Sequence, residues 1–182
     1  TVYHYGGLMM ELCEDIDASD AMYEAGFEAF PDEGRFAFMI SANASNYRKD
    51  TDRALLWMKK AAAAPNSAPW YSASVAGLIK KDDGLDSSIS YLEEQLKMME
   101  PSPFRDYTEK RYRSLLHESY EIKIEELRQK FIVATGRKPS VVEELHIPVS
   151  DPYEVQGGEW IIAEDGRVRS SVVESKKRRK AQ

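Results

Sequence analysis

The sequence predicts a mainly α-helical chain in which antiparallel helical repeats precede a long helix and a small β-hairpin. The central observation is residues 52–65, an amphipathic pattern that a proline closes. Related patterns occupy residues 20–31 and 86–101, so that closing prolines stand at positions 31, 65 and 101. A helix, a proline and a turn that recur after about 35 residues are typical of helical repeat proteins.

Three helix pairs are expected in the first part of the chain. Large apolar residues recur there at helical spacing, and small residues between them permit a neighbouring helix to approach closely. Trp57 is one of the large residues and is expected in the core. The expected helices are residues 2–14, 21–30, 35–47, 52–65, 70–79 and 87–99.

The second part of the chain has a different pattern. Residues 104–135 contain neither glycine nor proline, which predicts one long helix or two helices joined near 117–119. The dipeptide Asp165-Gly166 is a strong hairpin turn between expected strands at 160–163 and 167–171. The expected parts are helical repeats over 1–103, a capping helix or helix pair over 104–136, a short helix with the hairpin over 137–173, and a basic disordered tail over 174–182.

Composition and motif spacing argue against several functional classes. The formal net charge of −6 makes nucleic acid a poor partner. No apolar run approaches the roughly 18–20 residues of a membrane-spanning helix. His4, His117 and His146 lack the spacing of a zinc site, and no glycine-rich phosphate loop or nucleophile motif occurs. We therefore expect no metal, no cofactor and no enzymatic activity.

Two further features are interpreted as structural. The only cysteine, Cys13, lies in an apolar helical pattern and is expected to be a buried small side chain. An acidic cluster lacks the central glycine of a calcium loop and is interpreted as a solvated helix end with N-caps. Its members are Glu11, Glu14, Asp15, Asp17 and Asp20.

Residues 2–101 resemble the tetratricopeptide repeat family. Gly7, Gly26 and Ala61 match the small positions of that family, and Ala54 matches its helix-opening alanine. The closing prolines and the aromatic residues that open the first helices also match; the aromatics are Tyr3, Phe38 and Trp70. The resemblance implies stacked helix pairs whose first helices line a concave groove for a peptide or a helix.

A partner-binding groove therefore follows from this resemblance. Asn43 lies where such repeats often place an asparagine that hydrogen-bonds the backbone of a ligand. The candidate groove residues are Leu8, Glu11, Leu12, Met39, Asn43, Asn46, Tyr47, Tyr71, Ser74 and Leu78, with His4 beside them.

The C-terminal part resembles the end of type II secretion pseudopilins. This resemblance is carried by Thr135-Gly136, Pro139, Asp151-Pro152-Tyr153 and Gly157-Gly158. It implies a bacterial, envelope-associated protein with an extracytoplasmic location, which a segment before Thr1 would anchor.

The leading hypothesis is a non-enzymatic module that binds a protein or peptide partner. The first alternative is an accessory enzyme or ligand-binding module with a cleft beside the hairpin, formed by Tyr153, Glu159 and Trp160. The second alternative is a self-assembling structural subunit. The sequence alone assigns neither the partner nor the oligomeric state.

Overall fold

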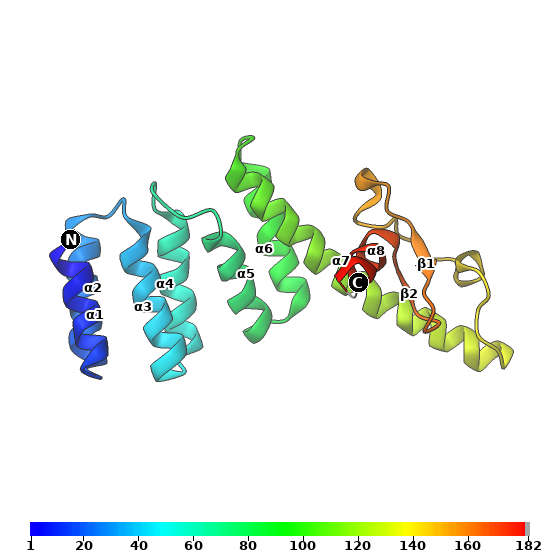
Figure 1. Ribbon diagram of the computed structural model, residues 1–182, viewed down its shortest axis with the longest axis horizontal. Coiled ribbons are helices and arrows are strands. Elements are labelled where there is room, and N and C mark those ends of the chain that lie inside the picture. The colour runs from blue at the N-terminus through cyan, green and yellow to red at the C-terminus, as the bar shows by residue number, and fades with distance from the viewer. Residues whose placement is uncertain (181–182) are drawn as a thin grey trace. The chain divides into compact units, whose positions relative to one another are not determined.

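A row of helices forms the first part of the chain (Figure 1). The computed structural model describes residues 1–180, which divide into two units, Thr1–Arg111 and the part from Tyr112 onward. From α1 to α6 each helix packs against the next one along the chain. The elements are α1 (Val2–Leu12), α2 (Ile16–Ala29), α3 (Gly34–Asn43), the π-turn η1 (Ala44–Arg48), α4 (Thr51–Ala63), α5 (Tyr71–Asp82), α6 (Leu85–Met98) and the beginning of α7 (Pro103–Thr135).

Side chains that cap the backbone explain where several of these helices begin. The carboxylate of Asp15 accepts a hydrogen bond from the backbone N–H of Ala18 at 3.0 Å. The carboxylate of Asp50 accepts one from the backbone N–H of Arg53 at 2.9 Å. Such caps satisfy N–H groups that the first helical turn leaves without a partner. Each predicted closing proline follows the end of a helix, because proline cannot continue the hydrogen-bond ladder.

Two apolar clusters form the core of the first unit. Close approach of helices is possible because small residues lie at the crossings; Gly26, for example, lies against Phe36 and Tyr3. Trp57 is partly buried and packs against both clusters. The first cluster contains Ala37, Met58, Ala61, Tyr71, Val75 and Ile79, and the second contains Tyr23, Phe36 and Ile40.

The structure corrects two expectations in this unit. Cys13 is exposed, because α1 ends at Leu12 and Cys13 already belongs to the turn that follows. The helix expected over 35–47 is α-helical only to Asn43 and continues as the π-turn η1. Lys49 then takes a left-handed conformation (φ 56°), which reverses the chain before α4.

The second unit contains the rest of α7 and a hairpin that packs on it. The 33 residues of α7 are one continuous helix, which decides between the two expectations for this segment. Strands β1 (Trp160–Ile162) and β2 (Val168–Ser170) pair antiparallel, with Trp160 opposite Ser170. The remaining elements are the 3₁₀ turns η2 (Val142–Leu145) and η3 (Glu154–Gln156) and the helix α8 (Ser171–Lys180).

The hairpin is held by apolar packing and by one buried arginine. Ile124 of α7, Leu145 and Val168 form the core, with Trp160 and Ile162 packed against it. Arg128 of α7 donates from Nε to the carbonyl oxygen of Gly166 in the hairpin turn, at 2.9 Å. Because a two-stranded sheet is marginal alone in water, this attachment to α7 is what stabilises it.

The basic segment near the C-terminus is also corrected. Residues up to Lys180 form α8 rather than a disordered tail, and residues 181–182 lie outside the described part. Glu174 stabilises the first turn of α8, since it accepts from Arg169 at 3.2 Å. Arg178 binds Glu164 at 2.9 Å, so one charge of this segment has a partner on the hairpin.

The mainly α fold with a C-terminal β-hairpin is thus confirmed. Across residues 1–180, every helix is too short or too polar to cross a bilayer.

Candidate functional site

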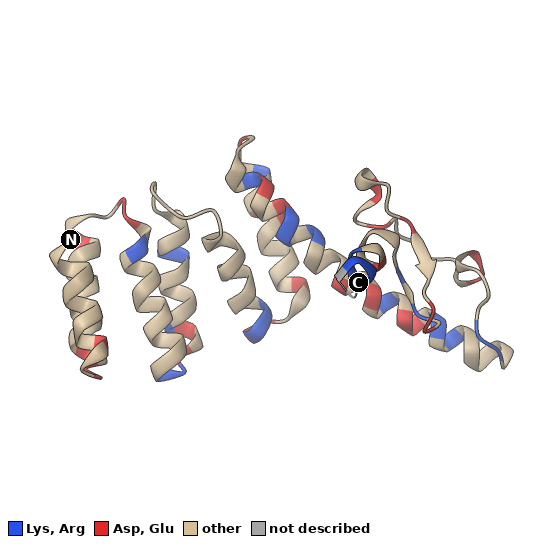
Figure 2. Cartoon of the chain, in the orientation of Figure 1, with Lys and Arg blue, Asp and Glu red and all other residues tan. Residues whose placement is uncertain are grey.

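An apolar row runs along the exposed side of α1. Val2, Tyr5, Met9 and Leu12 are 80%, 68%, 55% and 71% exposed, and their spacing places them on one side of the helix. Leu8 lies beside them and is 38% exposed. We call these five residues the α1 row. Figure 2 shows that α1 carries no Lys or Arg.

The α1 row is exposed because the other side of the helix faces α2. Gly7 is buried, and a Cβ atom there would meet the ring of Tyr23. Glu11 also faces α2, since its carboxylate accepts from Tyr23 Oη at 2.9 Å and from Ser19 Oγ at 3.2 Å. Burial and the neighbouring Glu11 carboxylate raise the pKa of Tyr23 far above its usual value. Glu11 therefore contributes to packing, while Leu8 and Leu12 remain exposed.

Two of the candidate groove residues are buried, which corrects their expected role. Asn43 is 2% exposed, and its Nδ2 donates to Asp20 Oδ1 at 2.9 Å and to Ser19 Oγ at 3.2 Å. Tyr71 is 5% exposed and belongs to the apolar core. Neither side chain can reach a ligand in the groove without leaving these contacts.

The other candidates lie at or near the surface. Met39 and Leu78 are half-buried and pack against the two core clusters. Ser74 donates its hydroxyl to the carbonyl oxygen of Trp70 at 3.2 Å. Asn46 and Tyr47 are exposed in η1. His4 is half-buried and lies beside the ring of Tyr23, 6.4 Å between centroids.

Asp20 is the centre of a polar network that sequence reasoning placed on a solvated helix end. The carboxylate is buried, and besides Asn43 it accepts from Arg48 and Arg53, each at 3.2 Å. Arg48 also binds the exposed Asp17 at 2.6 Å. A pocket of about 400 Å³ opens beside these residues. Since Asp17, Asp20, Arg48 and Arg53 are all paired with one another, we interpret this cluster as a clamp between α2, η1 and α4.

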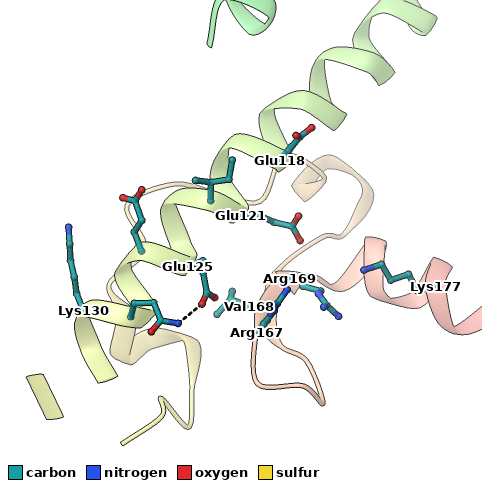
Figure 3. A pocket seen from close by; sticks show the side chains of 11 residues that line it. Glu118, Glu121, Glu125, Lys130, Arg167, Val168, Arg169 and Lys177 are labelled. Carbon is teal, nitrogen blue, oxygen red and sulfur yellow. Dashed lines mark hydrogen bonds between the residues drawn. The ribbon is translucent and has the colours of Figure 1, made fainter. Parts of the chain in front are cut away.

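A larger pocket, of about 810 Å³, lies in the second unit (Figure 3). One wall is α7, where Ile122 is 53% exposed among glutamates. The other wall carries positive charge and comes from the hairpin and α8. The α7 wall also contains Glu118, Glu121, Glu125, Glu126, Gln129 and Lys130, and the opposite wall contains Arg167, Val168, Arg169 and Lys177. We call this pocket the β2 groove.

Behind the hairpin lies a group of buried polar atoms. His117 stacks on Trp160, with 5.7 Å between ring centroids, and lies 5.6 Å from Tyr153. Among the described residues, no hydrogen-bond partner is present for His117 Nε2, Asp151 Oδ2 or Ser170 Oγ. Burial is the main cause that lowers the pKa of His117 below its ordinary value.

Of the residues of the predicted cleft beside the hairpin, Tyr153 and Trp160 both lie against the ring of His117, whereas Glu159 does not. Trp160 donates its indole N–H to the carbonyl oxygen of Val149 at 3.0 Å, and its ring is covered by His117. Tyr153 lies beside the same His117 ring, and Glu159 is exposed. Over residues 1–180, no three His, Cys, Asp or Glu side chains are grouped as a metal ion would need.

No model of a known protein family matches the chain, and no curated protein matches it. Function is therefore inferred from the surfaces described above.

Proposed function

We propose that the chain is a non-enzymatic scaffold whose helical array binds an apolar segment of a partner protein along the α1 row. The observation that carries this proposal is the exposure of Val2, Tyr5, Met9 and Leu12 on one side of a single helix. A contiguous apolar patch of this kind is typical of an interaction site.

The composition of the row suits a protein interface. Aromatic residues and methionine are enriched in interface cores, whereas the charged residues that are depleted there are absent from the row. Full burial of each large apolar side chain contributes about 1.5–3 kcal/mol, against an association cost of about 4–15 kcal/mol. Binding therefore requires a partner that covers several of these side chains together.

The length of the row indicates the size of that partner segment. From Val2 to Leu12 the helix rises about 15 Å at 1.5 Å per residue, which corresponds to three helical turns. An amphipathic helix of similar length that presents its own apolar stripe would cover the row. The resemblance to tetratricopeptide repeats supports the same function, because Leu8 and Leu12 belong to the predicted groove.

Site-specific crosslinking tests this proposal. A photoreactive phenylalanine analogue at position 9 is expected to crosslink a partner in extracts of the native host, and the same analogue at position 98 is not. Met98 is a matched control because it is exposed (72%) on α6, away from α1. The double variant Tyr5→Ser and Leu12→Ser should lose the partner, whereas Leu56→Ser with Met98→Ser should keep it.

Two results would contradict the proposal. Equal partner recovery by the row variant and by wild type would show that the α1 row does not bind. A crosslink from position 9 to a second copy of the chain, with a matching increase in mass by light scattering, would replace the scaffold with the self-assembling alternative.

A further inference from the structure

The β2 groove lies along the outer edge of a two-stranded sheet. Its described lining comes from α7, α8 and the β2 side of the hairpin, and none of it comes from β1 (Figure 3). A pocket over the face of the sheet would be lined by both strands. The groove therefore follows the edge of β2 that does not pair with β1.

The hydrogen-bond pattern shows which backbone groups point to this edge. At the two ends of the ladder, Ala163 donates its backbone N–H to the carbonyl oxygen of Arg167 at 2.8 Å, and Ser171 donates its backbone N–H to the carbonyl oxygen of Glu159 at 2.9 Å. Bonded and non-bonded pairs alternate in an antiparallel ladder. Since Val168 lies one residue after Arg167, its N–H and C=O point away from β1, towards the groove.

The dimensions of the groove suit an extended peptide. The α7 wall runs from Glu118 to Lys130, which is about 18 Å at 1.5 Å per residue. An extended strand of five residues has nearly the same length, at about 3.4 Å per residue. Helices do not pair with a strand edge, whereas an added strand forms main-chain hydrogen bonds along it.

Charge and apolar contact define the chemistry of that peptide. Alternate side chains of an added strand would point towards α7, where Ile122 is exposed and Glu121 and Glu126 line the wall. On the β2 side, Arg169 is already bound by Asp165 at 2.5 Å and Glu174 at 3.2 Å. With four glutamates against one lysine, Lys130, the α7 wall favours long basic side chains, whose aliphatic stems cover Ile122 while their charges reach the carboxylates.

We propose that the β2 groove binds an extended segment of a partner protein, which adds as a third strand to the free edge of β2 and directs alternate Lys or Arg side chains towards the glutamates of α7. This site is independent of the α1 row and lies in the other unit of the chain.

Fluorescence anisotropy with the whole chain tests the proposal. The probe is a fluorescein-labelled hexapeptide of alternating lysine and threonine, and the charge control alternates glutamate and threonine. Two further peptides carry N-methyl groups, one on all lysine nitrogens and the other on all threonine nitrogens. Only one of these sets can face β2, so strand addition predicts that one methylated peptide loses about tenfold or more in affinity and the other binds nearly as the parent.

Variants of the chain locate the site. Glu126→Lys should weaken the lysine–threonine probe by about threefold to tenfold, because it places a like charge in the wall. Glu143→Lys is the matched control, since Glu143 is exposed in η2 outside the groove and should leave binding unchanged. Hydrogen exchange measured by NMR should slow at the amide of Val168 when the probe binds.

Several outcomes would overturn the proposal: no saturable binding of the lysine–threonine probe, equal binding of the glutamate–threonine peptide, or equal loss with both methylated peptides. Binding that leaves exchange at Val168 unchanged would show contact through side chains alone and would also overturn strand addition. Each outcome is separate from the crosslinking result at the α1 row.

Discussion

Replacing Gly26 with alanine tests whether close helix approach builds the first unit. Gly26 lies inside α2, and a Cβ atom there would be 2.8 Å and 2.9 Å from ring atoms of Phe36 and 2.9 Å from Cβ of Tyr3. Real Cβ atoms essentially never approach other heavy atoms within 3.0 Å. Phe36 is fully buried, so its ring cannot move aside without displacing the core.

The magnitude follows from two opposing effects. Overpacking a well-packed core costs about 1–3 kcal/mol. Alanine is also a better helix former than glycine, by about 1 kcal/mol. Gly77→Ala isolates this second effect, because Gly77 is in α5 and its Cβ atom would meet no atom within 4 Å. We therefore expect Gly77→Ala to raise the free energy of unfolding by about 1 kcal/mol. The free energy of unfolding of Gly26→Ala should be about 1–3 kcal/mol lower than that of Gly77→Ala.

Urea unfolding followed by tryptophan fluorescence measures the difference. A Trp160→Phe background is used so that the signal comes from Trp57 and Trp70, both in the first unit. The change in midpoint at constant slope gives the change in stability. A Gly26→Ala chain as stable as Gly77→Ala would refute the close approach of α1, α2 and α3 at this crossing.

Three further predictions concern charged groups. Asp20→Ala should lower the free energy of unfolding by about 3 kcal/mol in urea titrations, because two arginines lose a buried partner, whereas Asp17→Ala at an exposed site should cost less than about 1 kcal/mol. His117 has a lowered pKa in the folded state, so below its unfolded pKa of about 6.5 the unfolded chain takes up a proton first. The free energy of unfolding of the second unit should therefore fall as the pH drops from about 6.5 towards the folded pKa. In a His117→Gln chain, the free energies of unfolding measured at pH 7.5 and at pH 5.5 should differ less. Glu144 should titrate with a pKa of about 2 in NMR spectra, owing first to Arg137 and then to the backbone N–H of Ser140, and Arg137→Gln should raise this pKa towards its ordinary value; an unchanged titration would contradict the pairing.

The helices could be predicted from the sequence because apolar spacing and the closing prolines are local signals. Trp57 was expected in the core and packs against both clusters. The hairpin was also predicted, since Asp165-Gly166 is a local turn signal. In these cases the information lies within a few residues of the element itself.

The site was less predictable, since burial depends on contacts between distant residues. Asn43 was expected to face a ligand, yet it is buried because Asp20, 23 residues earlier, accepts from its amide. The β2 groove combines residues 118–130 with 167–177, and no local pattern joins them. One signal was present: Ile122 lies among the glutamates of α7, and an apolar residue on a charged helix face indicates a contact site.

The π-turn η1 has a consequence for how the chain tolerates changes in length. A π-turn holds one residue more than an α-turn, so the side chains beyond it are rotated relative to a regular helix. Arg48 reaches Asp17 and Asp20 from within this turn. Deletion of Ser45 would restore a regular α-turn and rotate Arg48 by about 100° away from these carboxylates. The clamp between α2 and α4 is thus encoded by residue count as well as residue identity, and a single deletion could release it with every charged residue still present.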